Sequence, residues 1–353
     1  MPMTALRRLL FPLLLASPIG VLADASVRAQ EIWLAPQPKA VDLIDMFKPD
    51  APWKDAASRT QVFKFYGNPF INPTPQDQLD TIVADVTRRR IAIALETGVM
   101  NLASNPRPPC GGWGLVEGYG PVALHELMAK KIKRAGGVIK YIAMDEPLWY
   151  GHYFKGGTPR FPQPGCQSSI GDVVKLIAPS LNVYIREFPD VSIGDIEPSN
   201  LADVGPGRGR SPDWQNDLAT WAAAFRAEIG RPLAFLHLDV GWEQPQASQN
   251  GRMVYDYARE LVRRQLIGKL GIIYNGNASD SSDAAWLQAA RDHVALMERD
   301  YGLHPDQAII QSWHPHPSHA MPESSQDTLT SLVDFYTARK SASPSSKDTE
   351  RRQ

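Results

Sequence analysis

Two carboxylates stand at the end of a short apolar run, in the sequence VIKYIAMDEPLWYG of residues 138–151. Asp145 and Glu146 follow the apolar residues directly, and Pro147 stops the run. An apolar run of this length that ends at a turn signal is typical of a buried strand. Two neighbouring carboxyl groups can exchange protons with a ligand, because repulsion between like charges raises the pKa of one of them. The stretch therefore indicates acid/base chemistry.

Further acids follow the neighbouring apolar runs, so the pair is one part of a larger set. The candidates at predicted strand ends are Glu96, Asp145, Glu146, Asp195, Glu197, Asp239 and Glu243. Any single one of them could be an ordinary solvated loop acid. Crowded carboxylates are costly, however, so four neighbouring strands that end in acids favour a site over a purely structural arrangement.

The spacing of these residues predicts which side chains share a face. Asp195 and Glu197 are two residues apart, and so are His237 and Asp239, which places each pair on one side of a strand. Glu146 precedes a proline, which should keep its backbone extended and out of the next helix. We therefore expect Glu146 to be the catalytic acid, with Asp145 as a neighbour that tunes its pKa.

Aromatic residues gather in the same segments as the acids. They are Trp113, Tyr119, Trp149, Tyr150, Tyr153, Phe154, Trp242 and Trp313. Aromatic faces stack on the apolar faces of sugar rings, while acids and amides bind hydroxyl groups. A saccharide cleft is the simplest common explanation. The residues predicted to bind substrate are Tyr66, Glu96, Trp149, Tyr150, His237, Trp242, Glu243, Asn275 and Trp313.

Apolar runs and helical patterns alternate along the chain eight times. The predicted strands are residues 31–35, 61–66, 90–96, 138–144, 191–197, 233–240, 269–275 and 307–313. The predicted helices are residues 39–47, 76–88, 122–135, 168–188, 213–229, 251–265, 282–301 and 328–340, the first being the weakest. Such alternation implies parallel strands with right-handed crossovers, and eight units close into a (β/α)8 or TIM barrel of a single domain. An open doubly wound sheet is the alternative.

The two cysteines fall in the two longest segments that leave a predicted strand. These segments are residues 97–121, with Cys110, and residues 147–167, with Cys166. An even pair of cysteines in an exported chain predicts a disulfide, which would connect the two loops across the mouth of the barrel. Two buried free thiols are the alternative.

The chain ends indicate export and a tail. Arg7 and Arg8 precede a short apolar run at residues 9–15, and small residues lead to cleavage after Ala25 or Ala29, which is the order of a signal peptide. We expect residues 1–29 to be removed, residues 30–340 to form the catalytic domain and residues 341–353 to be a disordered tail. The mature protein should then be secreted or periplasmic, with no membrane attachment.

Composition restricts the partners. The chain has 353 residues, of which 43% are hydrophobic and 21% charged, and a formal charge of −1 that becomes about −3 once residues 1–29 are removed. So weak a charge argues against a nucleic-acid partner. No Gly-x-Gly-x-x-Gly motif follows a predicted strand, so no dinucleotide cofactor is expected. We expect a monomer that acts on carbohydrate.

The Asp145-Glu146-Pro147 sequence resembles the Asn-Glu-Pro signature of the large superfamily of (β/α)8 glycoside hydrolases. The resemblance implies that Glu146 is the general acid/base. Retaining enzymes of that superfamily carry a nucleophilic Glu at the end of the seventh strand, where this chain has Asn275. The second carboxylate should therefore be Glu197 or Asp239, with Glu243 and Glu96 as further candidates, and an inverting or atypical pairing is favoured.

Three functions stay open at this point. The leading one is an exported glycoside hydrolase that cleaves an oligo- or polysaccharide by carboxylate catalysis. The others are a saccharide-binding barrel without catalysis and a barrel enzyme that depends on a divalent metal. The strip His314-Pro315-His316-Pro317-Ser318-His319 lacks an obvious carboxylate partner in sequence, so we expect substrate contact there and no metal site.

Overall fold

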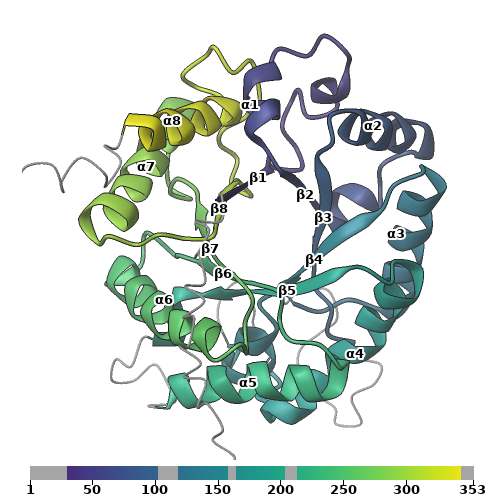
Figure 1. Ribbon diagram of the computed structural model, residues 1–353, viewed down its shortest axis with the longest axis vertical. Helices are drawn as coiled ribbons and strands as arrows, with labels where there is room; N and C mark the ends of the chain where they lie inside the picture. Colours follow the sequence, from purple (N-terminus) through teal and green to yellow (C-terminus); the bar gives the residue numbers. More distant parts are fainter. Residues whose placement is uncertain (1–29, 102–117, 158–163, 203–212, 343–353) are drawn as a thin grey trace, which may run out of the picture.

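The computed structural model describes residues 30–101, 118–157, 164–202 and 213–342. Eight parallel strands, each paired with the next, form a closed barrel in which β8 pairs with β1 (Figure 1). The predicted (β/α)8 barrel is confirmed, and the open sheet is wrong. The strands are β1 (Glu31–Ala35), β2 (Val62–Tyr66), β3 (Ala92–Thr97), β4 (Ile139–Asp145), β5 (Ser192–Pro198), β6 (Leu236–Asp239), β7 (Leu270–Tyr274) and β8 (Gln307–Gln311).

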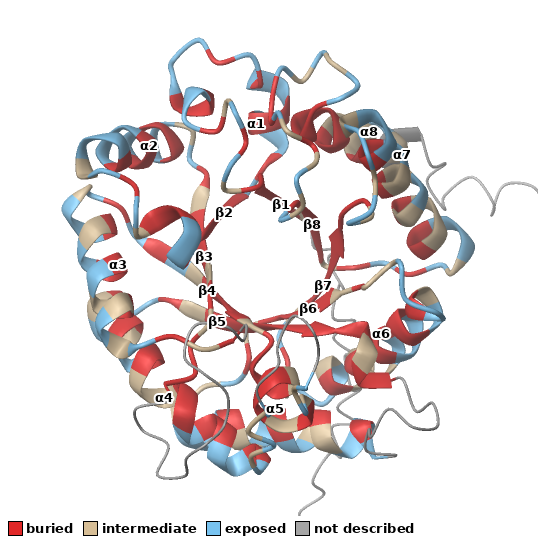
Figure 2. Cartoon of the chain, turned by 180° about the vertical axis from the view of Figure 1, so that it is seen from behind, coloured by how far each residue is buried: buried red, intermediate tan, exposed pale blue. Residues whose placement is uncertain are grey.

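Helices cover the outside of the barrel in chain order (Figure 1). They are α1 (Lys54–Arg59), α2 (Gln76–Arg88), α3 (Val122–Arg134), α4 (Ile170–Glu187), α5 (Trp214–Ile229), α6 (Ala247–Arg263), α7 (Asp283–Val294) and α8 (Leu329–Ala342). Figure 2 shows buried residues along the strands and on the helix faces that pack against them, with exposed residues on the outer faces. This is the packing expected of amphipathic crossover helices.

Capping residues mark the start of α7 and the ends of α3 and α5. Ser282 caps α7 by accepting the backbone N–H of Ala285. Gly136 and Gly230 follow α3 and α5 with φ values of 80° and 78°, a left-handed conformation that glycine adopts at little cost.

The first unit differs from the prediction. The predicted helix at residues 39–47 is wrong, because its only helical part is the short 3-10 helix η1 (Asp45–Phe47). The α-helix of this unit is α1, which begins further along the chain at Lys54. Prolines at positions 36, 38, 49 and 52 surround the predicted helix and limit its length.

The centre of the barrel is filled by apolar side chains that point inward. They are Trp33, Val62, Ala94, Ala143, Ile196, Phe235, Ile273 and Ile309, together with parts of Ala92, Tyr141 and Ala234. Gly194 in β5 makes room for the large Phe235 ring, since a Cβ at Gly194 would lie 2.3 Å from ring atoms of Phe235. Alternation of small and large side chains is how the interior of a small barrel is filled.

Polar side chains lie inside the barrel on either side of this apolar layer. The ammonium group of Lys64 is fully buried and donates to Glu96 Oε2 at 2.5 Å and to Gln311 Oε1. Gln311 also donates to Glu96, so the three side chains of β2, β3 and β8 form one network. A buried cation needs such partners, because its desolvation is otherwise uncompensated.

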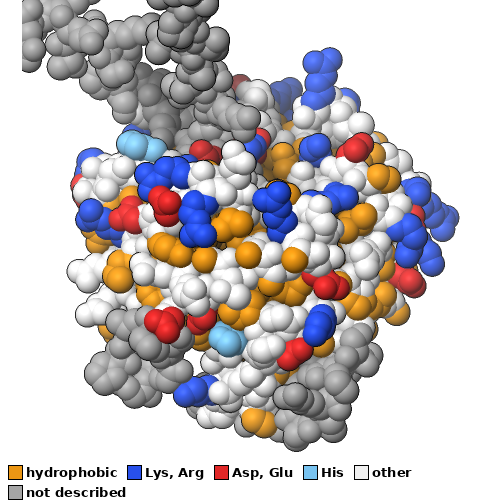
Figure 3. Space-filling view, turned by 60° about the horizontal axis from the view of Figure 1, so that its bottom comes forward, with side chains coloured by type: hydrophobic (Ala, Val, Ile, Leu, Met, Phe, Trp, Pro, Cys, Tyr) orange, Lys and Arg blue, Asp and Glu red, His pale blue; other side chains and the backbone are white. Residues whose placement is uncertain are grey.

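Lys and Arg side chains lie interspersed with Asp and Glu on the face seen in Figure 3, in keeping with the near-neutral charge of the chain. Within the described residues, no helix combines the length and the apolar character that a membrane crossing requires.

Substituting Gly194 by alanine should destabilise the barrel. The added Cβ would collide with the Phe235 ring, which is 1% exposed and cannot move away without disturbing the apolar layer. We expect a loss of about 1–3 kcal/mol in the free energy of unfolding, measured by urea denaturation.

The matched control is Gly171→Ala in α4, where nothing lies within 4 Å of the added Cβ. This variant should be neutral or gain up to about 1 kcal/mol from higher helix propensity. Equal stability of the two variants would contradict the packing argument.

Candidate functional site

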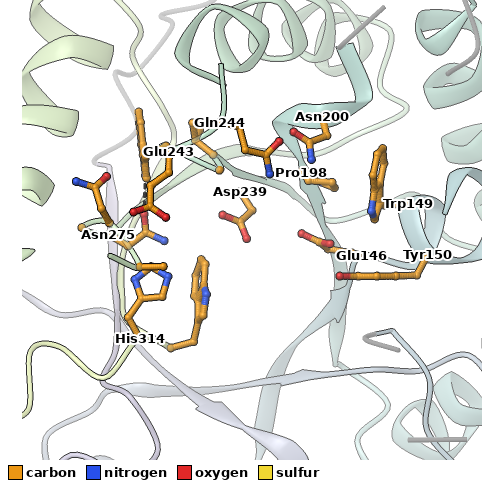
Figure 4. A pocket seen from close by; sticks show the side chains of 17 residues that line it. Glu146, Trp149, Tyr150, Pro198, Asn200, Asp239, Glu243, Gln244, Asn275 and His314 are labelled. Carbon is orange, nitrogen blue, oxygen red and sulfur yellow. Dashed lines mark hydrogen bonds between the residues drawn. The ribbon is translucent and has the colours of Figure 1, made fainter. Parts of the chain in front are cut away.

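A cavity of about 250 Å³ opens at the carboxyl ends of β4 to β8. Figure 4 shows Glu146, Trp149 and Tyr150 on one side of it, and Glu243, Asn275 and His314 on the other, with Asp239 between them. The lining residues are Glu146, Trp149, Tyr150, Pro198, Asn200, Asp239, Val240, Gly241, Trp242, Glu243, Gln244, Asn275, Gly276, Asn277, Ala278, Trp313 and His314.

Glu146 is the first residue after β4, and its backbone is unusual. Its φ is +48°, in the left-handed region, so the expectation of an extended backbone before Pro147 is wrong. A non-glycine residue in this region costs on the order of 1 kcal/mol and persists only where its surroundings fix it. The Glu146 N–H donates to the carbonyl of Ile196 at 3.1 Å, and the Glu146 carbonyl accepts from Tyr150 at 2.9 Å. These bonds fix the turn, and Figure 4 shows that its side chain points toward Asp239.

Glu197 supports the same turn from behind. Its Oε1 accepts the backbone N–H of Leu148 at 2.7 Å and its Oε2 accepts that of Trp149 at 3.0 Å. The side chain is fully buried and does not line the cavity. The structure thus separates Glu197 from Glu146 and Asp239 and places it where it caps the backbone that follows β4.

Asp195 shares the face of Glu197, as the spacing predicts. Its Oδ2 accepts the indole N–H of Trp221 in α5 at 2.6 Å, so this face of β5 looks toward the helices. Burial raises the pKa of Asp195, against the opposing effect of the Trp221 hydrogen bond. Burial, and next the nearby charge of Asp195, raise the pKa of Glu197. The two acids therefore retain protons to higher pH than exposed carboxyl groups do.

Asp239 ends β6 on the face that looks into the barrel mouth. It shares this face with His237, as predicted, but only Asp239 reaches the cavity. His237 is fully buried, stacks on Phe235 at 4.3 Å between ring centroids and donates Nε2–H to Gln307 Oε1 at 2.9 Å. Burial, followed by the charge of Lys64, lowers the pKa of His237 well below its usual value. The structure places it beneath the site, away from any ligand in this cavity.

Three other predicted residues also lie beside or beneath the cavity without lining it. Glu96 is the partner of Lys64 and Gln311. Tyr66 is buried and donates its hydroxyl to the carbonyl of Ser312 at 2.8 Å. Asp145 is half-buried at the end of β4, close enough that its charge contributes to the raised pKa of Tyr66, after burial and the charge of Glu96.

The predicted aromatic residues Trp149, Tyr150, Trp242 and Trp313 all line the cavity. Trp313 is 41% exposed, so part of its side chain is accessible to solvent. Trp242 instead stacks on His293 of α7, with 3.8 Å between ring centroids and an interplanar angle of 8°. The other predicted cavity residues, Glu243 and Asn275, are also in place.

Residues that the sequence did not single out complete the site. Asn200 and Gln244 line the cavity two and five residues after the ends of β5 and β6. The only feature of the sequence that could have identified Asn200 and Gln244 is their position shortly after a predicted strand. Trp286 and His293 on α7 contact the lining residues from behind, and nothing in a helical segment marks them for that role.

Two predictions concern a disulfide and a metal. Cys110 lies outside the described residues, so the Cys110–Cys166 bridge stays a prediction. Among the described residues, no group of three or more His, Cys, Asp or Glu side chains is arranged to bind a metal ion. His316 instead pairs with Asp283, at 2.5 Å between Nδ1 and Oδ1.

Neither a protein-family model nor a curated protein sequence matches the chain. Among solved structures, a GH5_18 variant from Streptomyces cattleya in complex with Manβ1-4GlcNAc is 12% identical, with a TM-score of 0.50 over 90% of this chain and 82% of that chain. The GH53 catalytic domain of Ignisphaera aggregans is 11% identical (TM-score 0.46, over 87% of this chain and 92% of that chain). A GH10 structure from Paenibacillus barcinonensis is also 11% identical (TM-score 0.46, over 87% and 95%). The match to the Streptomyces protein shows a shared (β/α)8 fold.

The buried acid pair should make stability fall as pH rises. The pKa values of Asp195 and Glu197 are higher in the folded than in the unfolded state, so each group stabilises the folded protein fully below its unfolded pKa of about 4. As the pH rises from there toward the folded pKa, the free energy of unfolding falls by roughly 1 kcal/mol per pH unit for each proton that only the folded state retains. Asp195→Asn keeps an oxygen acceptor for Trp221 but removes one acid, so the fall between about pH 5 and pH 8 should become shallower. Urea denaturation across that range measures the slope.

The control for this prediction is Asp256→Asn in α6, where the carboxylate is 60% exposed. It should leave the slope of the wild-type protein unchanged. Parallel pH profiles for Asp195→Asn and the wild-type protein would show that Asp195 takes no part in the proton uptake.

Proposed function

We propose that the protein is a glycoside hydrolase that cleaves O-glycosidic bonds of an oligo- or polysaccharide, with Glu146 and Asp239 as the catalytic pair. The main support is that these two carboxylates, at the ends of β4 and β6, line one cavity beside Trp149 and Tyr150 (Figure 4). Hydrolysis of a glycosidic bond needs one carboxyl group that donates a proton and one carboxylate that assists the attack. Aromatic residues beside them supply surfaces on which sugar rings can stack.

In the proposed reaction, the protonated Glu146 transfers its proton to the glycosidic oxygen as the bond between that oxygen and the anomeric carbon breaks. Asp239 removes a proton from a water molecule, whose oxygen forms the new bond to the anomeric carbon. Glu146 ends as a carboxylate and Asp239 as a carboxylic acid, and proton exchange with solvent restores both. This sequence inverts the configuration of the anomeric carbon.

Asn275 supports this choice of mechanism. It lines the cavity as the first residue after β7, and its amide cannot act as a nucleophile toward the anomeric carbon. Glu197 is excluded from the pair by its position, because both of its oxygens are occupied by backbone donors. We assign Glu197 a positioning role for the turn that carries Glu146.

We also propose that the enzyme acts outside the cytoplasm, as a secreted or periplasmic monomer. This part rests on the signal-peptide pattern of residues 1–29 and on composition alone. Mass spectrometry of the mature protein should find an N-terminus at Ser26 or Gln30 if the pattern is cleaved as expected.

Glu146→Gln and Asp239→Asn should each lower kcat by about 100-fold to 10,000-fold on natural oligosaccharides, because each removes one proton-transfer group. The two variants should differ on an aryl glycoside with a good leaving group, such as a dinitrophenyl glycoside. Such a leaving group needs no protonation, so Glu146→Gln should recover much of its rate, whereas Asp239→Asn should stay slow. Steady-state kinetics on both substrate types measures this.

Glu260→Gln in α6, where the carboxylate is 45% exposed on the outer face, serves as the matched control and should keep wild-type rates. Near-normal hydrolysis of oligosaccharides by Glu146→Gln would overturn the assignment of the acid. Binding of oligosaccharides by the wild-type protein with no product after long incubation would instead support a saccharide-binding barrel without catalysis.

The stereochemistry of the product provides an independent prediction. If Asp239 activates water directly, the first product released should have the anomeric configuration opposite to that of the bond cleaved. Proton NMR during the first minutes of hydrolysis distinguishes the two anomers before they equilibrate. Retention would show that a covalent or otherwise double-displacement route operates and that the inverting assignment is wrong.

A further inference from the structure

Two tryptophan side chains donate their indole N–H groups to polar residues that line the cavity. Trp286 Nε1 donates to His314 Nδ1 at 3.1 Å, and Trp242 Nε1 donates to Asn275 Oδ1 at 2.5 Å. An indole N–H is a donor only and has no acceptor capacity. Each bond therefore determines which atom of its partner acts as the acceptor, and which atom is left to face the ligand.

For His314, the bond determines the tautomer. Because Nδ1 accepts from Trp286, the proton of the neutral ring must lie on Nε2. Figure 4 shows the His314 ring pointing into the cavity from the segment after β8. The neutral ring therefore offers an N–H donor on the edge away from Trp286.

The surroundings of His314 favour the neutral ring. Burial lowers the pKa of His314, and this effect exceeds the opposing attraction of Glu243 and Asp280, the two charged groups beside it. Glu146 and Asp239 face it across the same cavity. Glu243 is itself occupied, since its Oε1 accepts the backbone N–H and the hydroxyl of Ser279.

For Asn275, the bond determines the orientation of the side-chain amide. Its Oδ1 is occupied by Trp242, and its backbone carbonyl accepts Nδ1–H of His293 at 2.7 Å. Trp242 and His293, whose rings stack on each other, thus bind the side-chain oxygen and the backbone carbonyl of Asn275 respectively. The side chain, 1% exposed, points its remaining amide group into the cavity (Figure 4).

Close packing behind β7 makes the Trp286 contact possible. A Cβ at Gly276 would lie 2.5 Å from Trp286 Cγ, so only glycine lets the indole approach the strand end at this distance. Trp286 is fully buried and cannot adopt an alternative position without disturbing the core.

We propose that Trp286 and Trp242 are positioning residues that fix His314 and Asn275 as hydrogen-bond donors, and that these donors bind an uncharged oxygen acceptor of the substrate sugar. The β7–β8 side of the cavity then donates, while Glu146 and Asp239 on the β4–β6 side carry carboxylates. An acidic sugar is disfavoured, because its carboxylate would lie among Glu146, Asp239 and Glu243. The acceptor is a hydroxyl oxygen or the carbonyl of an acetamido group. The ligand part of this inference rests on the proposed function.

The tautomer is tested directly on the wild-type protein by long-range proton–nitrogen NMR after labelling with nitrogen-15 histidine, with His314→Gln to assign the signal. At pH 6.5, where an ordinary histidine is about half protonated, His314 should show a neutral ring with the proton on Nε2. In Trp286→Phe, Nδ1 loses its donor, so the titration of His314 should move to higher pH. A proton on Nδ1 in the wild-type protein would overturn the proposal.

Trp53→Phe is the matched control for Trp286→Phe. Trp53 is also fully buried, but its indole donates to the carbonyl of Met46, near α1 and remote from the cavity lining. It should lower stability without changing the His314 signals. The same change in both variants would show that the effect of Trp286 is general loss of packing.

The ligand is tested by calorimetric titration of the Glu146→Gln protein with xylotetraose, cellotetraose, N-acetylated chitotetraose and tetragalacturonate. Binding of chitotetraose alone identifies a carbonyl acceptor, and binding of the first two identifies a hydroxyl acceptor. Adding Asn275→Asp keeps an acceptor for Trp242 but replaces the amide donor by oxygen, so uncharged ligands should bind about tenfold weaker or worse.

The failures of the two proposals are distinguishable. Tightest binding of tetragalacturonate, or unchanged affinity in Asn275→Asp, would overturn the donor assignment while leaving glycoside hydrolysis in place. Absence of binding by all four sugars, together with absence of hydrolysis by the wild-type protein, would overturn the proposed function and the ligand with it. The NMR result would then still decide whether Trp286 fixes the His314 tautomer.

Discussion

The turn that carries Glu146 is held by the side chain of Glu197, whose two oxygens accept the backbone N–H groups of Leu148 and Trp149. The chain must turn sharply after β4 because Glu146 adopts a left-handed backbone conformation immediately before a proline. Such a conformation is costly in isolation and needs surroundings that determine it. Glu197 supplies them from the neighbouring strand, and the N–H of Glu146 adds a bond to the carbonyl of Ile196 in the same strand.

The limited space inside the barrel explains why some polar residues near the strand ends are buried in pairs while others line the cavity. A closed barrel of eight strands has little space inside, so the inward-facing polar residues below the mouth must pair with one another. Lys64 with Glu96 and Gln311, and His237 with Gln307, are such pairs. Only residues one step higher, such as Asp239, reach the cavity.

Helix α7 shapes the site although no residue of it lines the cavity. Its Trp286 donates to His314 and its His293 donates to the backbone carbonyl of Asn275, and neither of the two helix residues lines the cavity. Because an indole donates and cannot accept, the tautomer of His314 is determined by Trp286, a residue outside the cavity lining. A residue behind the lining thus determines which ring nitrogen of His314 can donate into the cavity.

The sequence by itself predicted eight parallel strands with crossover helices and the end of the strands at which the cavity lies. Apolar runs that alternate with amphipathic segments set eight strands and the order of the barrel, since only parallel strands with crossovers satisfy that alternation. The same pattern places Glu146, Asp239, Asn275 and Trp313 at the carboxyl ends of strands, where the cavity is found. The period of two also predicted that Asp195 shares a face with Glu197.

Tertiary structure alone decided which face each strand turns to the barrel mouth and what each side chain contacts. The pair Asp195 and Glu197 looks toward the helices, whereas the pair His237 and Asp239 looks inward, and nothing in the two spacings distinguishes them. The predicted extended backbone of Glu146 is wrong because hydrogen bonds to residues outside the local sequence outweigh the effect of the following proline. Contacts between residues far apart in the chain, such as Trp286 with His314, leave no periodic signal, so their physical consequence appears only when the chain is folded.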